Sequence, residues 1–213
     1  VEEGNGWRRT PERRRPGQGQ EEDGTVRGRA IRVYPVDGTR VVCYCRDCQA
    51  FAHALNAAER VLDAQGGTDI YQLPPARLQI HQGHDQIRCL RLSSKGLYRW
   101  YAGCCNTPIG NTLGPGVPLV GLIHSFISDP FAEQKIGPVR ARVNLKGATA
   151  EIPRDSVKTA PGQVYMRKLL LRMLLWKLTG KARPNPFFMG KSPRVTPIIL
   201  SPGSAVEHNG ATD

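Results

Sequence analysis

The sequence lacks long apolar segments. Its 213 residues contain no run of about 18 apolar residues, the length that spans a bilayer, and no apolar signal-peptide core at the N-terminus. We therefore expect no membrane span and a soluble, cytoplasmic protein. Hydrophobic residues make up only 39% of the chain, beside 17 prolines and 23 glycines, so part of it is expected to be irregular.

Acidic residues are also scarce, with 18 Asp and Glu against 30 Lys and Arg. Most of the excess lies near the C-terminus, because residues 133–213 carry 14 basic and 5 acidic groups whereas residues 33–132 carry 8 and 7. A basic segment is suited to nucleic acid or another anionic partner. Here the basic residues are scattered rather than interleaved with aromatic residues for base stacking, so the charge permits this function without favouring it.

Composition divides the chain into three parts. Residues 1–23 contain only Val1 and Trp7 as large apolar groups, which is too little to offset the entropy of ordering, and we expect this basic, Gly-rich segment to be disordered. Residues 24–129 carry the cysteines and form the expected domain. Residues 130–213 form a basic extension that contains one helix, at about 163–178, packed on that domain.

Short alternating runs predict a mainly β domain. Residues 25–33 and 39–45 flank the turn "PVDG" and predict two antiparallel strands. Four more strand-like runs, at 69–73, 77–83, 86–92 and 96–103, are separated by turn residues, as in a small antiparallel sheet. We expect residues 104–118 to be an ordered loop before the apolar strand 119–127.

One helix is predicted within the domain, over residues 47–62. Its apolar positions recur at spacings of four, three and four residues, namely Phe51, Leu55, Ala58 and Leu62.

The helix at 163–178 carries basic residues around most of its circumference: Arg167, Lys168, Arg172 and Lys177. This distribution argues against a membrane-surface helix, which would segregate its charges on one face. It favours a helix docked on the sheet with extended basic side chains. The Pro-rich segment after it, residues 183–200, is expected to cover the core with Phe187, Phe188, Ile198 and Ile199.

Six cysteines are present, and three of them follow the pattern Cys-x-Cys-x-x-Cys at Cys43, Cys45 and Cys48. Clustered thiols in a chain without a secretory signal favour metal binding over disulfides. Thiolates are soft donors, and a short loop can direct several sulfurs at one tetrahedral ion, so Zn²⁺ is the expected cofactor. Three thiols are one ligand short of a closed tetrahedral site.

Several residues are candidates for the remaining ligand. Cys104 and Cys105 are adjacent, so we expect their side chains to diverge and to have different roles. Cys89 lies in a strand-like run and is more typical of a small core residue. The histidines are also candidates: His53, His81, His84, His124 and His208.

The motifs "CYCRDC" at 43–48 and "RWYAGCCNTPIGN" at 99–111 resemble the family of the glutathione-dependent formaldehyde-activating enzyme and centromere protein V. The resemblance covers roughly residues 24–125, and residues 130–213 resemble the extension of a bacterial branch of that family. It implies a small antiparallel β-tent zinc domain, here with one inserted helix and a helical and extended C-terminal extension.

The family has two zinc sites. By resemblance, Cys43, Cys45 and Cys48 match its open site, which is associated with glutathione, and Cys105 matches the last cysteine of its structural site. Ala102 replaces another cysteine of the structural site, although Cys104 is close by. The resemblance therefore adds Cys105, or else Cys104, to the expected metal ligands.

The first cysteine pair of the structural site is missing, since Glu21 and Asp23 stand in its place. Either that site has been abandoned, or residues 1–23 are not the natural N-terminus, and the absence of Met at position 1 favours the second explanation. If the site is abandoned, Cys104 or Cys105 is free to close the three-cysteine site.

Two functions are compatible with these residues. The first is a carbon-sulfur lyase of the formaldehyde-activating type, in which zinc activates a small thiol such as glutathione. The basic extension would then attract the anionic thiol, and Tyr98 or Tyr101 would donate a hydrogen bond. The alternative is a non-catalytic module that zinc stabilises and that binds nucleic acid or an acidic partner. The sequence predicts no oligomeric state.

Overall fold

The computed structural model describes residues 24–26, 29–33, 38–80, 83–127, 132–153 and 162–201, and up to residue 33 only the backbone. The expected disordered segment 1–23 lies outside these residues. The strands are β1 Gly24–Val26, β2 Arg29–Val33, β3 Thr39–Cys43, β4 Thr68–Leu73, β5 Leu78–Ile80, β6 Ile87–Arg91, β7 Tyr98–Ala102, β8 Thr107–Thr112, β9 Val120–Ile123, β10 Ala141–Val143, β11 Phe188–Met189, β12 Ser192–Pro193 and β13 Ile198–Ile199. The helices are α1 Arg46–Ala54, α2 Ala58–Val61, α3 Ala132–Ile136 and α4 Gly162–Leu178, with short 3₁₀ turns at Pro75–Arg77, His84–Gln86, His124–Phe126 and Leu145–Gly147. The protein is mainly β, as predicted.

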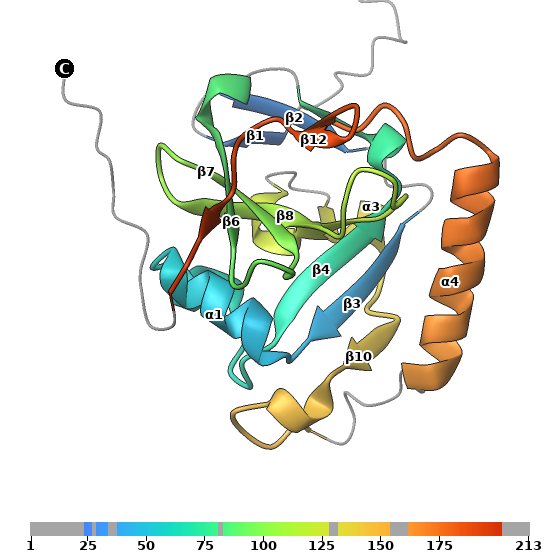
Figure 1. Ribbon diagram of the computed structural model, residues 1–213. Coiled ribbons are helices and arrows are strands. Elements are labelled where there is room, and N and C mark those ends of the chain that lie inside the picture. Colours follow the sequence, from blue (N-terminus) through green and yellow to red (C-terminus); the bar gives the residue numbers. More distant parts are fainter. Residues whose placement is uncertain are drawn as a thin grey trace, which may run out of the picture.

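An eight-stranded mixed sheet forms the body of the protein, in the order β10-β3-β4-β9-β8-β7-β6-β13 (Figure 1). Its inner strands pair antiparallel, whereas β10 pairs with β3 and β13 pairs with β6 in parallel. Both edge strands come from the C-terminal extension. The extension therefore completes the sheet at its two edges.

The predicted pairing of residues 25–33 with 39–45 is wrong. The first run forms two strands, β1 and β2, which join β5 in a separate three-stranded sheet. The second run forms β3, which pairs with β4. A local turn signal cannot show that a later strand offers better pairing, and this explains the error.

The predicted helix 47–62 is interrupted. Helix α1 ends at Ala54 and α2 starts at Ala58, because Asn56 adopts a left-handed conformation with φ 52° and donates its backbone N–H to His53 O. Asparagine tolerates this conformation better than most residues. The apolar positions Phe51 and Leu55 are buried, as their spacing predicted.

The expected loop 104–118 contains a strand, β8, that the sequence did not indicate. Glycine permits this strand to lie close to β9, since a Cβ on Gly110 would be 2.6 Å from Gly121 O. The proline and the glycine in "TPIGNT" predict a loop. Here they occur in a strand whose backbone packs closely on its neighbour.

The core is centred on Trp100 of β7, which is fully buried. Its ring stacks on Phe187 with centroids 4.7 Å apart, and its Nε1 donates to Thr112 Oγ1 at 2.9 Å. Phe187 and Phe188, which belong to the C-terminal segment, are thus buried, as predicted. Ile198 and Ile199, which were expected to cover the core, pair with β6 at the edge of the sheet and are 51% and 58% exposed.

Helix α4 confirms the helix predicted at 163–178 and its docking on the domain. Tyr165, Leu169 and Trp176 are buried in a cluster that includes Val41 and Ile123. Figure 1 shows α4 beside β3 and β10, with its other side turned away from the sheet. Within the described residues, no helix has both the length and the apolar character required to cross a membrane.

Candidate metal site

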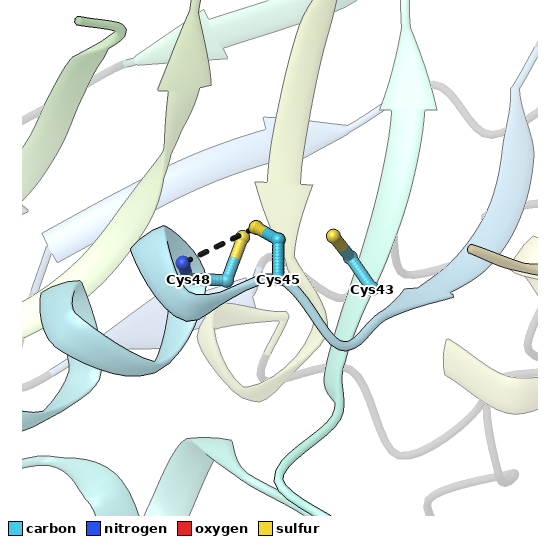
Figure 2. Close-up of side chains that lie close together, drawn as sticks. All are labelled: Cys43, Cys45 and Cys48. Atoms are coloured by element: carbon cyan, nitrogen blue, oxygen red, sulfur yellow. Dashed lines mark hydrogen bonds between the residues drawn. The ribbon is translucent and has the colours of Figure 1, made fainter. Parts of the chain in front are cut away.

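Three sulfur atoms converge where β3 leads into α1. The Sγ atoms of Cys43, Cys45 and Cys48 all lie within 4.8 Å of one another. Cys43 and Cys48 are buried and Cys45 is half-buried, so the cluster is covered by protein except near Cys45. Figure 2 shows Cys43 at the end of the strand and Cys45 and Cys48 at the start of the helix.

The spacing of the three cysteines follows from this strand-to-helix junction. Side chains two residues apart in extended backbone point to the same side, which brings Cys43 and Cys45 together. Cys45 is the N-cap of α1 and Cys48 is the third helical residue, the two positions whose side chains meet in a helix cap. Local geometry is therefore sufficient to bring the sulfurs together.

The start of α1 and the three thiols stabilise negative charge on sulfur. The backbone N–H of Cys48 donates to Cys45 Sγ at 3.4 Å, and the helix N-terminus carries partial positive charge (Figure 2). Hydrogen bonds from Cys45 and Cys48 lower the pKa of Cys43. The same hydrogen bonds raise the pKa of Cys45 and of Cys48, so the three thiols do not ionise independently. A divalent cation is what allows three adjacent sulfurs to be ionised together.

A buried network holds the cysteine loop in place through Tyr44. This side chain is fully buried, and its hydroxyl donates to Asp63 Oδ2 at 3.1 Å and accepts from Arg142 Nη1 at 2.6 Å. The backbone N–H of Tyr44 donates to Val143 O at 3.0 Å. The loop is thus anchored to β10, which belongs to the C-terminal extension.

The turn after β10 packs directly on the cysteine loop. Gln49 Nε2 donates to both Tyr44 O at 3.2 Å and Gly147 O at 2.8 Å, which joins the turn to the loop. The fit is close, since a Cβ on Gly147 would be 2.1 Å from Tyr44 O. Only glycine fits this position without a shift of the backbone.

Asn144 adds a side chain to the site from this turn. Its Nδ2 donates to Cys43 Sγ at 3.3 Å, and its backbone is left-handed with φ 57°. Donors of this kind orient a ligand and reduce the charge on its sulfur. Sequence reasoning missed Asn144, because it lies 101 residues from Cys43; the only local signal was an asparagine, which tolerates a left-handed backbone.

The first turn of α1 is also tied to the sheet by a buried arginine. Arg99 of β7 is 1% exposed, its Nη2 lies 3.6 Å from Asp47 Oδ2, and its guanidinium lies over the ring of Phe51. Asn111 Oδ1 accepts from its Nη1 at 3.2 Å. Arg99 therefore positions the helix that carries Cys48.

Cys104 and Cys105 lie in the turn between β7 and β8. This turn is at the same end of the sheet as Cys43, but β4 and β9 lie between β3 and β8. The two Sγ atoms are 3.3 Å apart, so the expectation that these side chains diverge is wrong. Neither cysteine belongs to the described three-residue group, and a metal-binding role for either stays a prediction.

The other candidates also lie outside the three-cysteine group. Cys89 is a core residue, as expected, and burial raises the pKa of its thiol to about 12. His53 and His84 are exposed, and His124 Nδ1 lies 4.0 Å from Asp69 Oδ2. His81 and His208 lie outside the described residues.

The two tyrosines considered as hydrogen-bond donors pack elsewhere. Tyr98 stacks on Trp100 and has Arg91 over its ring, and Tyr101 is buried beside Phe51 and Leu90. Tyr165 of α4, which sequence reasoning did not consider, shares a cluster with Cys43, and its hydroxyl donates to Gln72 Oε1. Burial raises the pKa of Tyr165 to about 12, so it is protonated at neutral pH.

Comparison with known proteins identifies the family but not an activity. No curated protein and no solved structure matches the chain. A family model matches residues 21–198, which include the cysteine loop, α4 and the eight-stranded sheet up to Ile198 of β13. The chain therefore belongs to the family of unknown function DUF6151.

Proposed function

We propose that Cys43, Cys45 and Cys48 bind one zinc ion and leave one coordination position for the thiol of a small substrate such as glutathione. The proposed activity is that of a carbon-sulfur lyase, which forms or breaks the bond between the substrate sulfur and a one-carbon unit. The resemblance of "CYCRDC" and "RWYAGCCNTPIGN" to the formaldehyde-activating family supports this proposal, beside the geometry of the site.

The donor set suits zinc. Zn–S bonds of about 2.3 Å in a tetrahedral site place sulfurs about 3.8 Å apart, and the three Sγ atoms already lie within 4.8 Å of one another. Small movements of the side chains are therefore enough to bind the ion. Thiolates also exclude magnesium and calcium, which require oxygen ligands.

The observation that carries the proposal is the number of ligands. Among the described residues, three cysteines form the group and no histidine, aspartate, glutamate or fourth cysteine joins it. Structural zinc sites have four protein ligands, whereas catalytic sites have three and keep one position open. Cys45 is the half-buried member, so a substrate would approach from its side.

A zinc ion in this site would lower the pKa of a thiol bound at the open position. In the proposed reaction, the substrate sulfur forms a bond to the carbonyl carbon of formaldehyde while the thiol proton is released. The carbonyl oxygen takes up a proton and becomes the hydroxyl of the S-hydroxymethyl product, and the reverse reaction breaks the same bond. The amide of Asn144 would keep Cys43 oriented and disperse its charge.

Metal analysis and NMR test this proposal together. We expect about one zinc ion per chain by elemental analysis. We also expect glutathione and ¹³C-formaldehyde to form the S-hydroxymethyl adduct faster with the protein than without it. Cys45→Ser should abolish both properties. Cys89→Ala is the matched control, because Cys89 is a core residue outside the group and should retain zinc and activity.

Two results would overturn the proposal. Folded protein that binds no zinc after purification in the presence of zinc would exclude the metal site. Zinc-loaded protein that does not accelerate the reaction, but retards DNA in a salt-dependent manner, would instead favour the non-catalytic binding module.

A further inference from the structure

Helix α4 is apolar on two sides, and the domain covers only one of them. Tyr165, Leu169 and Trp176 face the sheet and are buried. Seven other large apolar side chains of the helix are 42% to 74% exposed, namely Val164, Met166, Leu170, Leu171, Leu174, Leu175 and Leu178. A continuous apolar face of this kind on a protein surface marks an interaction site.

The exposed face has the spacing of a helix-packing seam. Val164, Arg167, Leu171, Leu174 and Leu178 recur at intervals of three, four, three and four residues. At 100° per residue this seam lies opposite the side that packs on the sheet. The intervals are those with which one helix packs along another.

Arg167 shows which kind of partner fits. It lies within the seam, between Val164 and Leu171, and is exposed. A helix lying in a membrane surface would place this charge at the centre of its buried face, where such helices are apolar. The seam is therefore better suited to a second helix, whose C-terminal end can lie beside the arginine.

We propose that the outer face of α4 binds the same face of a second copy of the chain, with the two helices antiparallel. In a parallel pair, Arg167 would face Arg167 of the other copy, and α4 contains no acidic residue to offset the repulsion. In an antiparallel pair, Arg167 lies against the last turn of the other helix, near Leu178. The C-terminal end of a helix carries partial negative charge, which attracts the guanidinium.

The two lysines of α4 fit the same arrangement. Lys168 and Lys177 lie on opposite flanks of the seam. In an antiparallel pair whose twofold axis passes between Leu171 and Leu174, they face Leu175 and Leu170 of the other copy. Lysine stems can cover these leucines while the ammonium groups stay in water. Every basic side chain on this face then meets an apolar side chain, and none meets another basic one.

The oligomeric state tests the surface. Sedimentation equilibrium should show a concentration-dependent dimer for the wild-type chain and a monomer for Leu171→Arg, with unchanged circular dichroism. Ile199→Arg is the matched control, because Ile199 is 58% exposed but lies in β13, at the edge of the sheet opposite β10 and α4. A wild-type monomer at every attainable concentration, or a dimer that survives Leu171→Arg, overturns the proposal. A monomer that binds anionic phospholipid vesicles through α4 would assign the face to a membrane surface instead.

Cross-linking tests the orientation. In the antiparallel pair, position 167 of one copy lies beside position 178 of the other, whereas the two positions 167 are 11 residues apart along the axis, about 16 Å. A disulfide needs Cα atoms within about 7 Å. A mixture of the Arg167→Cys and Leu178→Cys chains should therefore form a disulfide between positions 167 and 178 under mild oxidation. Neither variant alone should form a disulfide between its two introduced cysteines. Peptide mass spectrometry identifies the linked positions, and homodimers linked at 167 or 178 would overturn the antiparallel arrangement.

Discussion

The two cysteine groups lie at the same end of one sheet but are built differently. The group of Cys43, Cys45 and Cys48 spans a strand end and a helix start, is mostly buried, and receives a hydrogen bond from Asn144. Cys104 and Cys105 lie in a turn between two strands, where Cys104 is exposed and Cys105 contacts Thr107 Oγ1 at 3.0 Å. Proximity of sulfurs is common to both groups, so it does not by itself define a metal site.

The two cysteine groups differ in the number of sulfur donors and in how firmly other parts of the chain hold these donors in place. Three sulfurs can hold an ion on one side and leave the other open, whereas two sulfurs need ligands from elsewhere in the chain. The first group is also held by three separate elements, α1, β10 and the turn after β10. Buried hydrogen bonds of this kind keep ligands in position before the metal arrives. This contrast predicts which substitutions affect metal binding.

The largest difference is expected between Cys48→Ser and Cys104→Ser. Cys48→Ser removes one of three sulfurs, so we expect loss of the zinc and of several kcal/mol of the free energy of unfolding. Cys104→Ser alters an exposed side chain and should change that free energy by less than about 0.5 kcal/mol. Elemental analysis and urea unfolding measure the two effects. If Cys104→Ser removed the zinc, Cys104 would be a ligand and the three-cysteine site would be closed.

A smaller difference is expected between two glycines, one beside each group. Gly147→Ala places a Cβ 2.1 Å from the backbone oxygen of Tyr44, so the turn must move away from the cysteine loop. We expect a loss of about 1 to 3 kcal/mol in the free energy of unfolding and weaker zinc binding. Gly103→Ala meets the flexible side chain of Arg88 at 2.8 Å and should have little effect on either. Urea unfolding and competition with a chromophoric chelator provide the comparison. Equal effects of both substitutions would show that the turn does not support the site.

The smallest difference concerns one hydrogen bond in each group. Asn144→Leu removes the donor to Cys43 Sγ, and we expect zinc affinity to fall by about 10- to 100-fold without loss of the fold. Thr107→Val removes the contact with Cys105 and should leave zinc affinity unchanged. The ultraviolet charge-transfer band of the Co²⁺-substituted protein should also shift in Asn144→Leu, because it reports the charge on the ligand sulfurs. If neither the charge-transfer band nor the zinc affinity changed, Asn144 would only shape the turn and would not support the metal site.

Much of the local structure was predictable. Strands β4 to β7, helix α4 and the buried positions of α1 follow the periodicity of their residues. The wrong pairing of residues 25–33 and the missed strand β8 have a common cause, since the sequence cannot show which segments meet. Asn56 interrupts a helix whose pattern continues, and "TPIGNT" forms strand β8 because Gly110 allows β9 to lie close. At β8 a contact with another strand outweighed the local preference, whereas the helix is interrupted by the left-handed backbone of Asn56 itself.

By itself, the sequence determined that three sulfurs meet, because the side chains at Cys43, Cys45 and Cys48 converge through backbone geometry that spans only six residues. Tertiary structure alone decided what surrounds them. Asn144 and Gly147 reach the cysteine loop because β10 pairs with β3, about 100 residues away in the chain, and such pairing depends on the packing of the whole sheet. The exposed seam of α4 was likewise hidden in the sequence, because apolar and basic residues both lie around most of this helix and do not reveal which side the domain covers.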